Sequence, residues 1–345
     1  MELIVTPENP VPPQGVVAAI RAADGMILRV ARWHPVGQPV GTLLICSGRA
    51  QSIEQYFETI RELLQRQIVV VAFDWRGQGM SGRELSNPHK GHIDDFSLYE
   101  RDLAALVEQV LDPFCPQPWF ALGQSMGGAV LLAQARAGQC PFERLVLAAP
   151  LIDIYRLRYR QAMRLLVEGL DIIGFGGAFI PSGGRTTSLT RPFAGNPLTS
   201  DPQRYARNAA IVAAAPQFAV GAPTIGWVNA AFRRIEEFAD PEYPRRTLTP
   251  ILVVAAGADR VVDLTATERF ATRLKAGHLV VIPYAQHEIL AERDGLREQF
   301  WAAFDAFVPG TRDEVKALSI AHTYRVTAAA RRRRWPWSRA RSAGQ

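Results

Sequence analysis

The stretch Gly123-Gln124-Ser125-Met126-Gly127-Gly128 decides the fold class of this chain. It follows an apolar run of strand length, residues 119–122, and it precedes an alanine-rich stretch with helical spacing, residues 126–138. A serine on a sharp strand-to-helix turn needs small neighbours on both sides, and the helix N-terminus places N–H groups where an oxyanion would form. This setting predicts a nucleophile elbow with Ser125 as the nucleophile.

Apolar segments of strand length recur along the chain, and helical patterns separate most of them. The first two flank Ala23-Asp24-Gly25, which is typical of a hairpin turn. Apolar strands that alternate with helices predict a mostly parallel sheet with helices on both faces, which is an α/β class. The predicted strands are residues 16–20, 26–33, 42–46, 68–73, 119–122, 145–149, 251–255 and 279–282.

One long region interrupts this alternation. Residues 154–245 are rich in glycine and proline and contain short helical patterns but no strand pattern. Structureless loops of this length are rare, so we expect a helical cap inserted into the core. We also expect its apolar segments, including residues 165–170 and 174–180, to line an acyl-binding cavity. The predicted organisation is a core of residues 1–153 and 246–310, a cap of residues 154–245 and an extension of residues 311–345.

A nucleophilic serine needs a base, because its hydroxyl is a poor nucleophile at neutral pH. In this kind of sheet the base follows the last strand, and the chain order is serine, acid, histidine. His287 comes directly after the predicted strand 279–282 and fits this position. The other histidines precede the serine, precede that strand or follow the last helical pattern: His34, His89, His92, His278 and His322.

Two aspartates follow the strand 251–255 and compete for the role of the acid. Asp259 is nearer the strand end and is expected to reach the loop of His287. Asp263 directly precedes a helical pattern that starts at Leu264, so its carboxylate is better placed to cap that helix. Asp259 is therefore the predicted acid, with Asp263 as the alternative.

The oxyanion formed during acyl transfer needs two N–H donors. One is expected from the residue after the nucleophile, Met126, and the other from the loop after the strand 42–46. Gly48 permits a sharp turn in that loop, so the backbone N–H of Arg49 is the predicted second donor.

Other conspicuous residues favour structural roles. The run from Asp74 to Gly82 lacks a phosphate-binding Gly-x-Gly-x-x-Gly pattern and is interpreted as a tightly bonded supporting loop. Cys46 lies inside a predicted strand, and the cysteines (Cys46, Cys115 and Cys140) have no metal-ligand spacing. We expect free thiols of a cytoplasmic protein and neither a cofactor nor a metal.

The chain has 345 residues, of which 48% are hydrophobic and 21% charged, an ordinary globular composition. No apolar run reaches the ~20 residues that span a bilayer, and residues 1–15 do not resemble a signal peptide. The tail, residues 331–345, contains six arginines and no acid, and these account for the whole formal net charge of +6. Nucleic acid is therefore not an expected partner. The arginines and tryptophans of residues 331–341 favour a loose contact with an anionic membrane, on the inner face.

Several motifs resemble the α/β-hydrolases grouped as lysophospholipase L2 and monoacylglycerol lipase. The Gly-Arg pair at 48–49, where many lipases have His-Gly, is more similar to the first group. The resemblance covers residues 42 to 305, while the cap and the tail match less well. It implies Ser-His-Asp hydrolysis of acyl esters of glycerol derivatives, without a metal. The matching segments are residues 46–52, 73–82, 87–92, 123–128, 257–263 and 285–290.

The same residues leave other functions open. A short-chain esterase, a thioesterase or a peptidase would use the same three side chains on the same fold. Dehalogenation or epoxide opening through a carboxylate nucleophile is disfavoured, because position 125 is serine. A non-catalytic binding protein on this scaffold would be expected to lack one of the three residues, and none is missing.

Overall fold

The structure is a computed structural model that describes residues 1–138 and 140–310. Within these residues eight strands form one sheet, in the order β1-β2-β4-β3-β5-β6-β7-β8. β1 and β2 are antiparallel to their neighbours, and all other pairs are parallel. The strands are β1 (Val16–Arg21), β2 (Ile27–Trp33), β3 (Gly41–Cys46), β4 (Ile68–Phe73), β5 (Trp119–Gln124), β6 (Arg144–Ala148), β7 (Ile251–Ala256) and β8 (Gly277–Ile282).

The central strands are apolar along their whole length because both faces of the sheet are covered. Every residue of β3, β4, β5 and β7 is buried, as expected for strands between two helical layers. β1 and β2 form the predicted hairpin, and Gly25 adopts a φ of 89° in its turn, a conformation that glycine accepts without steric cost.

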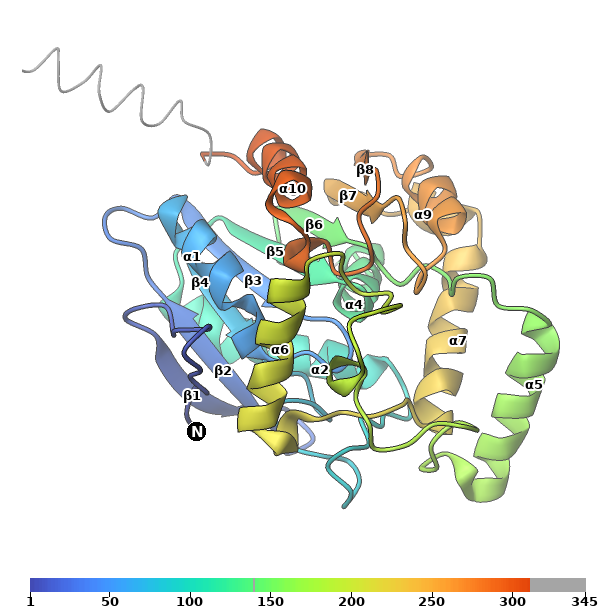
Figure 1. Ribbon diagram of the computed structural model, residues 1–345. Coiled ribbons are helices and arrows are strands. Elements are labelled where there is room, and N and C mark those ends of the chain that lie inside the picture. The colour runs from blue at the N-terminus through green and yellow to red at the C-terminus, as the bar shows by residue number, and fades with distance from the viewer. Residues whose placement is uncertain (139, 311–345) are drawn as a thin grey trace, which may run out of the picture.

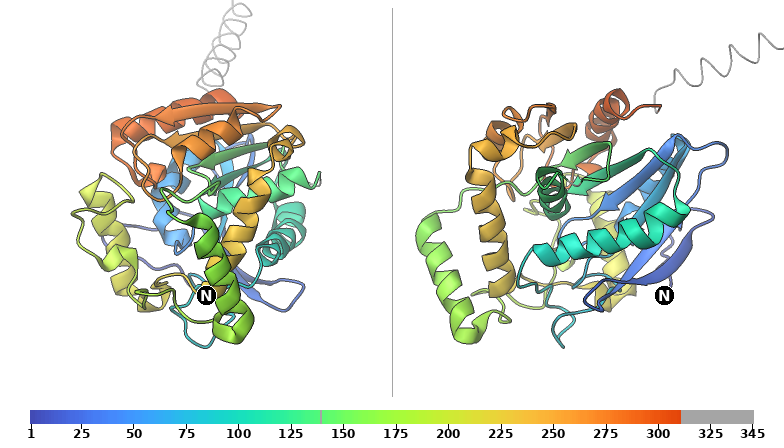
Figure 2. Two further views of the ribbon diagram at one scale, coloured as in Figure 1. Left: turned by 90° about the vertical axis from the view of Figure 1, so that its right-hand side faces the viewer. Right: turned by 180° about the vertical axis from the view of Figure 1, so that it is seen from behind.

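Helices cover the two faces of the sheet (Figures 1 and 2). α1 (Phe57–Gln65) and α10 (Asp294–Phe307) lie on one face, where Arg66, the residue after α1, binds Asp305 of α10 at 2.7 Å. α2 (Ser97–Leu106) and α4 (Met126–Arg136) lie on the other. The remaining helical segments of the core are η1 (Ile53–Tyr56), η2 (Val107–Leu111), α3 (Asp112–Phe114), α9 (Leu264–Ala271) and η6 (Ile289–Ala291). This arrangement confirms the predicted α/β class.

Residues 154–245 connect β6 to β7 and contribute helices but no strand of the sheet. The segment holds α5 (Arg160–Leu170), η3 (Asp171–Phe175), η4 (Ser188–Thr190), α6 (Pro202–Ala214), η5 (Pro216–Phe218), α7 (Ile225–Ala239) and α8 (Glu242–Arg245). α5 packs on α7 through Val167 and Phe232, and α6 lies beside α1 in Figure 1, where Arg204 binds Glu58 at 2.6 Å.

The loop from Asp74 to Gly82 is tied to the core by buried charges. Asp74 accepts a hydrogen bond from Arg29 Nε at 2.7 Å and from the backbone N–H groups of Ile53 and Met80. Arg29 in turn binds Glu54 at 2.8 Å. Removing one member would leave an unpaired buried charge, which is costly. The loop therefore holds a fixed shape beside the carboxyl ends of β3 and β4, in agreement with the supporting role expected from the sequence.

Several expectations concern residues outside those that the structure describes. The C-terminal extension, residues 311–345, includes His322 and the arginine and tryptophan residues of 331–341, and it lies beyond the described part of the chain.

Candidate active site

Ser125 lies on a tight turn between β5 and α4, with a φ of 50° and a ψ of −111°. The turn brings the start of α4 against β3 and leaves no room for side chains beside the serine. A Cβ added at Gly123 would lie 2.7 Å from the Cα of Gly128, and one added at Gly127 would overlap the carbonyl oxygen of Cys46. Both glycines are therefore required by close approach of the backbone, as the predicted elbow demands.

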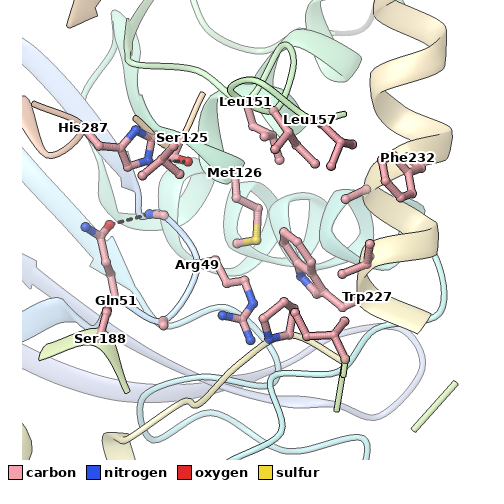
Figure 3. A pocket seen from close by; sticks show the side chains of 18 of the residues that line it. Arg49, Gln51, Ser125, Met126, Leu151, Leu157, Ser188, Trp227, Phe232 and His287 are labelled. Carbon is pink, nitrogen blue, oxygen red and sulfur yellow. Dashed lines mark hydrogen bonds between the residues drawn. The ribbon is translucent and has the colours of Figure 1, made fainter. Parts of the chain in front are cut away.

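The structure brings Ser125, His287 and Asp259 together at the carboxyl edge of the sheet, and Figure 3 shows the first two of them. His287 Nε2 lies 3.0 Å from Ser125 Oγ, and His287 Nδ1 lies 2.9 Å from Asp259 Oδ2. With the proton on Nδ1, the imidazole donates to the carboxylate and accepts from the serine hydroxyl. This is the geometry of a nucleophile, a general base and an orienting acid.

Both partners of the serine are held by further hydrogen bonds. The second carboxylate oxygen of Asp259 accepts from the backbone N–H groups of Val261 and Val262, at 2.7 and 3.0 Å. The carbonyl of His287 accepts from Gln124 Nε2 at 2.9 Å. The bonds from Val261 and Val262 leave the other oxygen of Asp259 free to bind the imidazole. The bond from Gln124 fixes the loop that carries His287.

The other candidates for the acid and the base lie away from Ser125. Asp263 caps α9, where its side chain accepts from the N–H of Ala266 at 2.8 Å, as expected from the sequence. His278 was expected just before the last strand, but it is the second residue of β8, which begins two residues earlier than the apolar pattern indicated. It therefore lies at the opposite edge of the sheet from Ser125.

The predicted oxyanion donors come from two segments, the start of α4 and the loop after β3. Met126 occupies the first position of α4, where a helix leaves its N–H groups without a partner within the helix. In the loop after β3, the N–H of Gly48 donates to Gln51 Oε1 at 2.6 Å and the N–H of Ala50 donates to Gln78 Oε1 at 2.7 Å. Within the described residues, no hydrogen bond uses the N–H of Arg49 between them.

The two glutamines that hold this loop were not predicted from the sequence. Gln78 also donates to the carbonyl of Gly48 at 3.0 Å, so one side chain binds the loop through both its oxygen and its nitrogen. Gln51 accepts from Tyr56 Oη at 2.6 Å and donates to Glu288 at 3.1 Å. The side chain of Gln78 comes from the loop 74–82, whose glycines and charges were conspicuous in the sequence but did not indicate what the glutamine contacts.

We expect Gln78→Ala to lower kcat by about tenfold or more with a small change in KM, because a loosened loop misplaces a donor used mainly in the transition state. Steady-state kinetics on a nitrophenyl ester would measure both constants. Gln109→Ala is the matched control, since Gln109 also bonds one backbone segment through both side-chain atoms, at Arg21, away from the site. An equal loss of kcat in both variants would contradict the positioning role.

A cavity of about 520 Å³ opens beside the serine, within the usual range for small-molecule sites (Figure 3). The core contributes Ser125, Met126, Leu151 and His287 to its wall. Apolar side chains of the segment 154–245 complete the wall, including Leu157, Met163, Leu166, Val167, Leu170, Ile180 and Phe232. Of the two segments expected to line it, 165–170 therefore contributes three residues, whereas 174–180 contributes only Ile180.

Neither a metal site nor a membrane span is found in the part of the chain that the structure describes. No cluster of three or more histidine, cysteine or acidic side chains there could hold a metal ion, and no described helix is long and apolar enough to cross a membrane. The three cysteines are free, and burial raises the pKa of Cys46 well above its usual range, which argues against a thiolate nucleophile.

The model of the family described as serine aminopeptidase, S33 matches residues 37–294. The chain belongs to this family. The family match includes the elbow and both partners of Ser125, and it confirms the α/β-hydrolase resemblance that the sequence motifs indicated. The chain is thus a serine hydrolase.

The chain is also similar to proteins named lysophospholipase and monoglyceride lipase. Lysophospholipase L2 of Escherichia coli is 37% identical over 268 residues, which cover 74% of this chain and 76% of that protein. Monoglyceride lipase of Rattus norvegicus is 32% identical over 147 residues, covering 43% of this chain and 46% of that protein. The first match spans both the core and much of the segment 154–245, while the second is confined to a shorter region.

Solved structures share the fold at lower identity. A monoglyceride lipase from Saccharomyces cerevisiae superimposes with a TM-score of 0.68 at 17% identity, covering 87% of this chain and 98% of that one. A carboxyl esterase from Bacillus coagulans superimposes with a TM-score of 0.70 at 20% identity, covering 86% and 98%. These likenesses establish the α/β-hydrolase fold of this S33 member.

Proposed function

We propose that this protein hydrolyses acyl esters of single-chain glycerolipids, lysophospholipids or monoacylglycerols, through an acyl-enzyme on Ser125. The observation that carries the proposal is the position of Ser125, bonded to His287 and beside an apolar cavity of about 520 Å³. The names of the relatives, a lysophospholipase and monoglyceride lipases, support the same class of substrate.

In the first half-reaction, Ser125 Oγ attacks the ester carbonyl while His287 Nε2 takes its proton. Asp259 holds the imidazole in the required tautomer and stabilises its positive charge. The N–H groups of Arg49 and Met126 donate to the carbonyl oxygen as it becomes an oxyanion. The intermediate collapses, the bond to the alcohol breaks, and His287 returns the proton to the departing alcohol oxygen.

In the second half-reaction, water replaces the alcohol. His287 takes a proton from the water as its oxygen attacks the acyl carbon, and the same N–H groups hold the second oxyanion. Collapse releases the fatty acid and returns the proton to Ser125 Oγ. The chemistry uses only groups of the chain and water.

The division into a core of residues 1–153 and 246–310 and a cap of residues 154–245 is part of this proposal. In this view, the core supplies the reacting groups and the cap supplies most of the apolar wall that binds the acyl chain. The lining by Leu166, Val167 and Phe232 supports this division of roles.

Two experiments test the function. Labelling with a fluorophosphonate would show whether Ser125 is an activated nucleophile. A panel of monoacylglycerols, lysophospholipids, short-chain esters, thioesters and aminoacyl amides would then separate the lipid esterase from the alternatives, including the peptidase that the family description suggests. Faster turnover of an amide or a short-chain ester than of every long-chain glycerolipid would contradict the proposal.

A loose contact with an anionic membrane is also proposed, consistent with a cytoplasmic protein peripheral to the inner face. Its first element is the basic and aromatic tail, residues 331–341, since arginines near an anionic bilayer each contribute about 1 kcal/mol. A second contact surface lies on α5, its N-cap and η3, where large apolar side chains are exposed next to the cavity wall: Tyr159, Met163, Leu165, Leu166, Ile172, Ile173 and Phe175. An apolar patch of this kind favours contact with a lipid surface.

We expect the full chain to co-sediment with anionic vesicles at low salt and a truncation to residues 1–330 to lose most of this binding. High salt weakens the tail contribution, because the attraction is mostly Coulombic. We expect the vesicle binding that remains in the truncated chain to fall further when Ile172→Ser and Ile173→Ser are introduced together.

Val36→Ser is the control for an exposed apolar side chain far from the cavity, and it should leave sedimentation unchanged. Equal sedimentation of the full and truncated chains at low salt would remove the role of the tail.

A further inference from the structure

Arg49 is charged, partly buried and without an acidic partner. Its guanidinium lines the cavity beside Ser125, with its centre 5.1 Å from the ring centroid of Trp227 (Figure 3). Nη2 donates to the carbonyl of Gly221 at 3.0 Å, and Nε is buried without a partner. Within residues 1–138 and 140–310, no carboxylate lies within 4.0 Å of this guanidinium.

Three other arginines with little exposure have more hydrogen-bonding partners than Arg49. Arg29 binds both Glu54 and Asp74, and Arg76 binds Asp102, Asp24 and Glu84. Arg83, which has no carboxylate partner, donates to the carbonyls of five residues: Gly79, Gln78, Ser81, Pro88 and Gln217. Arg49 has a single carbonyl bond, so its charge is less compensated than that of Arg29, Arg76 or Arg83.

The surroundings of Arg49 destabilise its charged form. Burial lowers its pKa to about 10, although Tyr99 acts in the opposite direction, so the group stays charged at neutral pH. Among the described residues that line the cavity, Glu288 is the only carboxyl, and it accepts from Gln51 rather than from Arg49. Removing a charge from water costs free energy, and an anion in the cavity would offset this cost more fully than the single carbonyl and the ring of Trp227 do.

We propose that the Arg49 side chain binds the phosphate of a lysophospholipid head group, and so selects phosphate-bearing acyl glycerols over neutral ones. The inference rests on the proposed ester hydrolysis at Ser125. Guanidinium binds phosphate oxygens in a fork, and Nη1 of Arg49 is available for such a bond.

The place of Arg49 in the chain fits this role. Its backbone N–H is assigned to the oxyanion, so the same residue would contact the substrate at two points. The glycerol unit that separates an ester carbonyl from a phosphate has about the length of the arginine side chain that separates the backbone N–H from the guanidinium. One substrate can therefore reach both groups.

A structural role alone is the competing interpretation. The contacts with Trp227 and Gly221 tie the loop after β3 to the segment 154–245. Such a tie would hold the cavity together for every substrate. A phosphate site, in contrast, raises the preference for phosphate-bearing over neutral acyl glycerols. The ratio of the two rates of hydrolysis therefore distinguishes the two interpretations.

The test compares kcat/KM for 1-oleoyl lysophosphatidylglycerol and 1-oleoylglycerol, which share the acyl chain and differ in the phosphate. We expect Arg49→Met to lower the ratio of the two constants by about tenfold or more, and Arg49→Lys to lower it less, because a charge remains. Arg32→Met is the matched control. Arg32 also has one carbonyl bond and one ring contact, both at Phe114 and away from the cavity, and its loss should leave the ratio unchanged.

A second measurement needs no variant. sn-Glycerol 3-phosphate should inhibit hydrolysis of 1-oleoylglycerol by the wild-type protein more strongly than glycerol does, at equal concentrations. An unchanged ratio in Arg49→Met, or equal inhibition by the two small molecules, would overturn the phosphate site. Failure of the wild-type protein to hydrolyse either lipid would instead overturn the proposed function.

Discussion

Replacing Ser125 by alanine should lower kcat/KM for ester hydrolysis by roughly 10³-fold or more, because the attacking oxygen is lost and only the oxyanion donors remain. The fold should survive, since the Oγ atom bonds only to His287 among the described residues. Stopped turnover of a nitrophenyl ester together with an unchanged melting curve would be the expected pair of results.

Ser97→Ala is a suitable control, because Ser97 is an exposed serine at the start of α2, away from the cavity. Fluorophosphonate should label the control and the wild-type protein but not Ser125→Ala. Turnover by Ser125→Ala at the wild-type rate would refute the acyl-enzyme mechanism and leave the cavity with another chemistry.

The two aspartates after β7 provide the second large difference. Asp259→Asn should lower kcat on the order of 10⁴-fold, because an amide can no longer hold the imidazole of His287 in the required tautomer. Asp263→Asn should leave kcat close to that of the wild type. Its carboxylate bonds the N-terminus of α9, where asparagine caps almost equally well.

Kinetics of both variants on one ester, with thermal unfolding as a second readout, would separate catalysis from stability. If Asp263→Asn were the inactive variant and Asp259→Asn the active one, the acid would be misassigned while the role of Ser125 would stand.

Much of the architecture was predictable because local patterns and chain order determine it. Apolar runs gave the eight strands to within a few residues, since buried parallel strands must be apolar on both sides. The elbow was predictable because only glycine fits at 123 and 127, against backbone on both sides. The chain order of nucleophile, acid and base then restricted the choice among the aspartates and histidines.

Contacts between distant loops were not predictable in the same way. Gln51 and Gln78 hold the loop of Arg49 through bonds to backbone atoms. The local sequence does not distinguish these two glutamines from the others in the chain. The uncompensated charge of Arg49 likewise depends on which side chains are absent around it, which a linear sequence does not indicate. The π-helical turn after α2, at Val107–Leu111, was also not predicted from the sequence.

The backbone of Ser125, at a φ of 50° and a ψ of −111°, has a consequence for evolution. A non-glycine residue in such a conformation costs about 1–3 kcal/mol, and glycine would adopt it more easily. Selection for heat resistance alone would therefore favour replacing the very residue that performs the chemistry. The serine persists only where ester turnover benefits the organism. In a lineage that no longer needs this activity, we therefore expect position 125 to be among the first to change, from serine to glycine.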